Sequence, residues 1–71
     1  MSRSLAQVLS GESGTVSGID ERDELSCRLY ELGFGIGSPV LVEQAGNPCI
    51  VRVGGGKVAM SRDLLDRVRI S

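Results

Sequence analysis

The stretch VLVEQAGNPCIVRVGGGKVAM, residues 40–60, contains three short runs rich in β-branched and other apolar residues. The runs cover residues 40–44, 49–53 and 57–60. They are separated by Ala45-Gly46-Asn47-Pro48 and by Gly54-Gly55-Gly56, which are residue types typical of tight reversals. Connections this short join antiparallel neighbours. The stretch therefore predicts a three-stranded antiparallel sheet.

Further short elements are predicted on both sides of this stretch. Residues 14–19 and 67–70 alternate between small or polar and β-branched residues, which is the pattern of a strand. Helical turns are expected at about 5–9, capped by Ser4, and at 62–66, capped by Ser61. Five strands with connections of two to five residues favour a small, closed or nearly closed antiparallel barrel. We expect one mainly β domain over residues 1–71.

One helix is predicted over about residues 22–32, inserted after the first strand. Leu25, Leu29 and Leu32 recur at spacings of four and three, which is the apolar stripe of an amphipathic helix. All three leucines are expected to face the core. Their predicted neighbours are the apolar strand residues Val16, Ile19, Val40, Val42, Val51, Val58 and Val68.

The sequence also carries signals for both ends of this helix. Asp20 or Asp23 is placed to cap its first turn. Gly33 follows the last leucine, at a position where a left-handed conformation favours glycine, and Phe34 is expected to fold back onto the helix end.

Composition limits the partners that the chain is expected to have. Among its 71 residues, 8 are basic and 9 acidic, for a net charge of −1, and no basic cluster is present. The only aromatic residues are Tyr30 and Phe34. We therefore expect no nucleic acid partner. No apolar run approaches the roughly 20 residues of a membrane span, and no signal-peptide core is visible, so we expect a cytoplasmic protein without membrane insertion.

The residue types that carry most enzyme chemistry are missing. Histidine is absent, and Cys27 and Cys49 stand alone without metal-ligand spacing. The run Gly54-Gly55-Gly56-Lys57 is followed by Val58, which does not fit a phosphate-binding loop. The carboxylates of residues 20–24 are those that a helix start favours. We expect no enzymatic activity, no cofactor and no metal site, which leaves binding as the function.

Three ordered segments resemble the FeoA-type proteins, the small accessory partners of the bacterial FeoB ferrous iron transporter. Residues 4–16 are similar to that family's opening L-x-x-L-x-x-G-E-S-G-x-V, and residues 28–40 to R-L-x-E-L-G-L-x-x-G-x-x-V. Residues 59–68 resemble the closing A-L-x-x and its trailing apolar position. The resemblance implies an SH3-like barrel and an accessory role in ferrous iron transport. It also implies a partner, the cytosolic part of a FeoB-type transporter.

Two other functions stay open at this point. The same fold occurs as the C-terminal domain of DtxR-type iron-dependent repressors, so the chain could be a peptide-binding or sensing module of such a regulator. A ferrous iron chaperone would need Cys27, Cys49 and carboxylates as ligands, which is a poor donor set for a strong site.

The predicted partner surface lies on the side of the helix opposite the leucine stripe. That side carries a thiol and the only tyrosine, and tyrosine is enriched at interfaces. The surface is predicted to comprise Cys27, Arg28, Leu29, Tyr30, Phe34 and Ile36, facing a transporter segment or a second copy of the chain. Alternatively, Tyr30 covers a neighbouring part of its own chain, or docking uses the sheet edges around Ala45 to Pro48.

Overall fold

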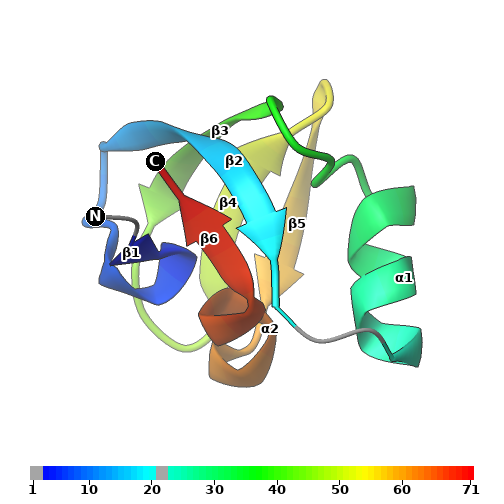
Figure 1. Ribbon diagram of the computed structural model, residues 1–71. Helices are drawn as coiled ribbons and strands as arrows, with labels where there is room; N and C mark the ends of the chain where they lie inside the picture. Colours follow the sequence, from blue (N-terminus) through cyan, green and yellow to red (C-terminus); the bar gives the residue numbers. More distant parts are fainter. Residues whose placement is uncertain (1–2, 21–22) are drawn as a thin grey trace.

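The computed structural model describes residues 3–20 and 23–71, which form one curled sheet with three short helical elements (Figure 1). The strands of the described residues are β1 (Arg3–Ser4), β2 (Ser13–Ile19), β3 (Pro39–Gln44), β4 (Cys49–Val53), β5 (Gly56–Met60) and β6 (Val68–Ile70). The helical elements are the 3₁₀ turn η1 (Leu5–Gln7) and the α-helices α1 (Glu24–Glu31) and α2 (Arg62–Arg67).

All strand pairs are antiparallel, in the order β1-β6-β2-β3-β4-β5. The first half of β2 pairs with β3, and its second half pairs with β6 after a register shift between Val16 and Gly18. β2 thus belongs to both halves of the sheet, so the sheet curls around the hydrophobic core. The prediction of a mainly β antiparallel fold with one inserted helix is confirmed.

The core is aliphatic apart from Phe34, as the composition predicts. Its buried members are Leu5, Val8, Val16, Leu29, Phe34, Val40, Val42, Cys49, Val51, Val53, Met60, Leu65, Val68 and Ile70. Of the predicted strand contributors, Ile19 and Val58 are only partly buried. Removing each large apolar side chain from water contributes roughly 1.5–3 kcal/mol.

Several boundaries differ from the predicted ones. A sixth strand, β1, is only two residues long and pairs with β6, with Arg3 opposite Ile70. A two-residue strand has no periodicity, so the sequence gives no sign of it. Ser61 precedes α2 but makes no side-chain capping bond. Residue 22, where the long helix was predicted to begin, lies outside the described residues.

The predicted leucine stripe is wrong for two of its three members. Leu29 is fully buried, whereas Leu25 and Leu32 are 38% and 41% exposed. The buried residue in the preceding turn is Ser26, at 2% exposure. At about 100° per residue, this places the contact side about 60° around the helix from the predicted one.

The cause of this rotation is the hydrogen bonding at the start of α1. The hydroxyl of Ser26 donates to the backbone carbonyl oxygen of Asp20 at 3.2 Å, which turns this small polar side chain toward the sheet. Burying a polar side chain is tolerated when its hydrogen bond is made.

No helix of the described residues is long and apolar enough to cross a membrane.

Candidate docking surface

The start of α1 is fixed by its capping residue. The carboxylate of Asp23 accepts a hydrogen bond from the backbone N–H of Ser26, with Oδ1 and N 3.0 Å apart, so the predicted cap is Asp23. This bond satisfies one of the free amides of the first turn.

Two ion pairs hold the segment before α1 against the C-terminal end of the chain. The second oxygen of Asp23 lies 2.6 Å from a guanidinium nitrogen of Arg67, and Asp20 lies 2.6 Å from Arg69. The backbone bond from Ser26, followed by the bond from Arg67, holds the pKa of Asp23 below its ordinary value. The position of α1 beside α2 therefore depends partly on charge.

The end of α1 has the hydrogen bonding of a Schellman motif. The N–H of Gly33 donates to the carbonyl of Tyr30, and the N–H of Phe34 donates to that of Leu29, both at 3.1 Å. Gly33 has φ +108°, which is the left-handed conformation predicted for it. Phe34 is thereby turned inward onto Leu29.

This inward turn corrects the predicted partner surface. Leu29 and Phe34 are each 0% exposed, so neither can contact a partner. They belong to the core because the Schellman turn stacks the residue after the glycine on the last turn of the helix. The four other predicted residues, Cys27, Arg28, Tyr30 and Ile36, are exposed.

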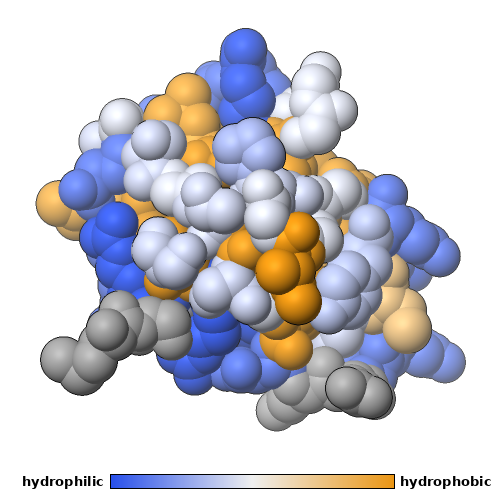
Figure 2. Space-filling model, turned by 45° about the horizontal axis from the view of Figure 1, so that its top comes forward, coloured by the Kyte–Doolittle hydropathy of each residue, from blue (hydrophilic) through white to orange (hydrophobic). Residues whose placement is uncertain are grey.

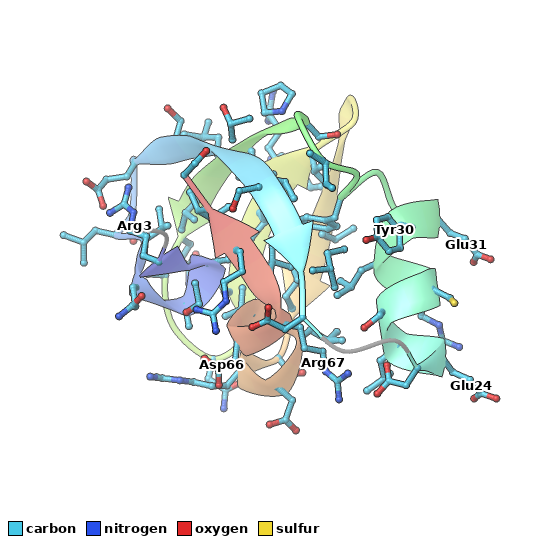
Figure 3. The ribbon with its side chains drawn as sticks, in the orientation of Figure 1. Arg3, Glu24, Tyr30, Glu31, Asp66 and Arg67 are labelled. Carbon is cyan, nitrogen blue, oxygen red and sulfur yellow. The ribbon has the colours of Figure 1, made fainter. Side chains whose placement is uncertain are left out.

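The structure divides these four residues between different places. Cys27 and Arg28 lie on the outer side of α1, in a shallow groove that they share with Asp23, Glu24 and Glu31. In Figure 3, Glu24 and Glu31 point away from the sheet, while Tyr30 lies on the side of α1 that faces it.

Tyr30 and Ile36 are the more apolar part of this region. Tyr30 is 49% exposed, which fits the alternative that its ring partly covers its own chain. Ile36 is 74% exposed, at the tip of a turn that is fixed because Gly37 donates to the carbonyl of Val16 at 2.8 Å. Figure 2 shows that hydrophobic residues on the face of the molecule turned forward there form small groups among neutral and hydrophilic ones. We define Cys27, Arg28, Tyr30 and Ile36 as the α1 patch.

A second concave region lies on the far side of the sheet from α1. The sequence analysis named only one part of it, the sheet edges around Ala45 to Pro48, as an alternative place for docking. This region is a groove between η1, the loop after β3, and α2. Of the lining residues in the described ranges 3–20 and 23–71, only Arg62 is charged. The exposed Leu9 was the available signal, since the predicted turn over 5–9 gives it no partner.

The described residues form no cluster of side chains that could bind a metal ion. Among residues 3–20 and 23–71, no three cysteine, aspartate or glutamate side chains gather in a way that could hold an ion. Cys27 is exposed on α1, whereas Cys49 is buried in the core, where burial raises the pKa of its thiol. The two cysteines therefore lie in different environments and form no common site.

The fold and its surfaces define a class of protein: a small SH3-like binding module. Within that class, the chain belongs to the FeoA domain family, whose model matches residues 3–71. The family consists of non-enzymatic accessory proteins of ferrous iron transport, so the expectations of family, fold and lack of enzymatic activity are confirmed. Comparison with curated protein sequences finds no match.

Solved structures agree with this assignment. The chain is similar to an iron uptake regulatory protein, FeoA, with 26% identity, 99% of this chain and 96% of that chain covered, and a TM-score of 0.89. It is also similar to the zinc complex of Stenotrophomonas maltophilia FeoA, with 26% identity, 97% and 89% coverage, and a TM-score of 0.90. That protein is described as a prokaryotic SH3 domain protein, suggested to activate ferrous iron transport.

The fold is shared with metal-dependent regulators as well. IdeR of T. acidophilum matches with a TM-score of 0.88 at 18% identity, and 99% of this chain covers 33% of that one. At this identity the match shows the fold alone.

Proposed function

We propose that this chain regulates ferrous iron transport by docking, through protein–protein contacts, on the cytosolic part of a FeoB-type transporter. The observation that carries the proposal is the family match over residues 3–71. In this proposal residues 1–71 act as one domain in the cytoplasm, and the chain neither binds nucleic acid nor inserts into the membrane.

The docking surface that we propose is the α1 patch, which extends from the outer side of α1 around the end of the helix to Tyr30 (Figure 3) and the turn at Ile36. Ile36 and Tyr30 supply apolar contact area, and Arg28 adds a guanidinium group next to the carboxylates of the helix. Tyrosine and arginine are among the residues that contribute most to binding at interfaces. The flanking carboxylates Glu24 and Glu31 make the rim of this patch polar, as interface rims commonly are.

The test measures binding of the chain to the purified cytosolic part of the transporter from the same genome. Ile36→Asp and Tyr30→Glu should each weaken binding at least tenfold without loss of fold. The matched control is Leu9→Asp, which places the same charge on another exposed aliphatic residue, far from α1.

The possible results show separately whether the proposed partner and the proposed docking surface are right. Loss with Ile36→Asp and retention with Leu9→Asp supports both the partner and the α1 patch. Loss with Leu9→Asp alone keeps the partner and moves docking toward the loop around Ala45 to Pro48. No binding by the wild-type chain would contradict the transporter as partner and would favour the alternative of a regulator module. A second copy as partner would appear as concentration-dependent dimerisation in sedimentation equilibrium that Ile36→Asp abolishes.

A further inference from the structure

The groove on the side away from α1 has the size of a ligand site. It encloses about 420 Å³ and lies between η1, the loop that follows β3, and α2. Protein pockets that take small ligands or side chains have about 300–1,000 Å³. In Figure 1 the blue turn beside β1 lies on the opposite side of the molecule from α1, and α2 lies below the sheet between them.

The groove has an apolar floor and one uncovered apolar wall. Val8, Cys49 and Leu65 form the floor and are only 3–4% exposed, so the core already covers most of their surface. Leu9 stands on the rim at 67% exposure, which is a large apolar side chain without cover. Ala6 and Ala45 line the space between floor and rim. Covering Leu9 and this space would remove apolar surface from water.

Two polar side chains of the rim have hydrogen-bonding capacity to spare. Within the described part of the chain, neither Arg62 nor Asn47 makes a side-chain hydrogen bond or an ion pair. Asp66 follows Arg62 by one helical turn, but no ion pair joins the two. Arg62 is therefore a free guanidinium group beside an apolar groove.

We propose that this groove binds a short extended segment of another protein in which apolar side chains precede a carboxylate. The apolar side chains would pack against Leu9 and the floor, the amide of Asn47 would bond to the peptide backbone, and Arg62 would bind the carboxylate. Arginine binds carboxylates through paired, charge-assisted hydrogen bonds. The proposal does not depend on the transporter as partner, because it rests on a different face from the α1 patch.

Charge argues for a protein segment over an anionic lipid surface. Among the residues that the structure describes, Arg62 is the only charged one that lines the groove, and the chain carries a net charge of −1. Attraction to an anionic membrane requires several basic residues together, each worth about 1 kcal/mol. A single arginine at the end of an apolar groove instead matches a single carboxylate.

The experiment is a ¹⁵N NMR titration of the full chain with two synthetic pentapeptides. Both peptides are acetylated and amidated and begin with serine, leucine, valine and leucine; the first ends in glutamate and the second in glutamine, so they differ by one carboxylate. We expect shift changes to concentrate at residues 5–9, 45–49 and 62–65. The charged peptide should bind about fivefold to tenfold more tightly, the difference expected for charge-assisted hydrogen bonds.

Matched variants measure the contribution of the carboxylate and that of the apolar side chains separately. Arg62→Gln should remove the preference for the charged peptide, and Arg28→Gln on α1 should leave it intact. Leu9→Asp should abolish binding of both peptides, whereas Ile36→Asp should not. If Leu9→Asp fails to keep the dispersed spectrum of the folded chain, Leu9→Ser replaces it, with a several-fold loss expected.

Five results would overturn the proposal. Three come from the titration: absence of binding at millimolar peptide, equal affinity for the two peptides, and shift changes centred on α1. The fourth is groove shifts that appear only with anionic lipid vesicles. The fifth is self-association that covers the groove, seen as concentration-dependent shifts at residues 5–9 without any peptide.

Discussion

The backbone N–H of Phe34 donates to the carbonyl oxygen of Leu29 at 3.1 Å, and both side chains are fully buried. This bond ends α1 and directs the chain inward, so the two residues link the helix to the sheet. Because Leu25 and Leu32 are substantially exposed, the helix depends on this link for most of its apolar contact with the core.

Leu29→Ala should therefore destabilise the domain by about 2–5 kcal/mol, the usual range for truncating a buried leucine. The total free energy of unfolding of a small domain is little larger than this, so the variant should be partly unfolded at 37 °C. Urea unfolding followed by circular dichroism measures the difference. Leu25→Ala and Leu32→Ala are the controls and should each cost less than about 1 kcal/mol. Equal losses for all three would show that α1 packs through the predicted stripe after all.

Gly33→Ala should cost roughly 1–2 kcal/mol, because a Cβ disfavours the φ of +108° found at this residue. Space is not the reason: an added Cβ would lie 3.6 Å from the nearest side-chain atom of Val53, which is ordinary contact. Gly35→Ala is the matched control, since Gly35 does not have a positive φ, and it should leave the thermal midpoint nearly unchanged. A midpoint for Gly33→Ala equal to that of the wild type would contradict the Schellman assignment.

Asp23→Asn should lower stability at neutral pH and have a smaller effect in acid. The folded chain holds the pKa of Asp23 below its ordinary value of 3.8 through the Ser26 N–H and Arg67. A lowered pKa means that the unfolded chain binds the proton more readily, so the carboxylate stabilises the fold above pH 4 and loses this effect as pH falls below it. Asparagine still caps a helix, so the variant removes the charge while keeping the cap.

Thermal melts of the wild type and this variant at pH 7 and pH 3 measure the effect of Asp23. The difference between the two thermal midpoints should be smaller at pH 3 than at pH 7, since the unfolded wild-type chain begins to bind the proton as pH falls below 3.8. An equal difference between the two thermal midpoints at both pH values would show that Asp23 acts through its hydrogen-bonding geometry and not through its charge.

The isolated chain should have no tight site for ferrous iron. It lacks histidine, and no group of three ligating side chains gathers in the described ranges 3–20 and 23–71. Anaerobic calorimetry with ferrous ion should show no stoichiometric binding at micromolar concentration. Tight one-to-one binding that Cys27→Ser abolishes would contradict this prediction and support an iron-carrying role.

Local signals in the sequence determined most of the fold. The short apolar runs, the reversal residues between them and the glycine after the helix each act over a few residues, so their patterns are visible without the tertiary structure. Gly33 and Phe34 end the helix as predicted. Gly54 and Gly55 form the predicted hairpin reversal, with φ of +59° and +86°. The resemblance to FeoA-type proteins, now confirmed, came from the order of such segments.

The tertiary structure alone decided which side of α1 faces the core and which residues remain on the surface. A helical wheel gives the spacing of Leu25, Leu29 and Leu32 but not the rotation of the helix. That rotation is set by contacts that a helical wheel does not contain, namely the Asp20 carbonyl that accepts from Ser26 and the distant Arg67 that pairs with Asp23. The groove at Leu9 and Arg62 likewise joins segments more than 50 residues apart, and only the closing of the sheet brings them together.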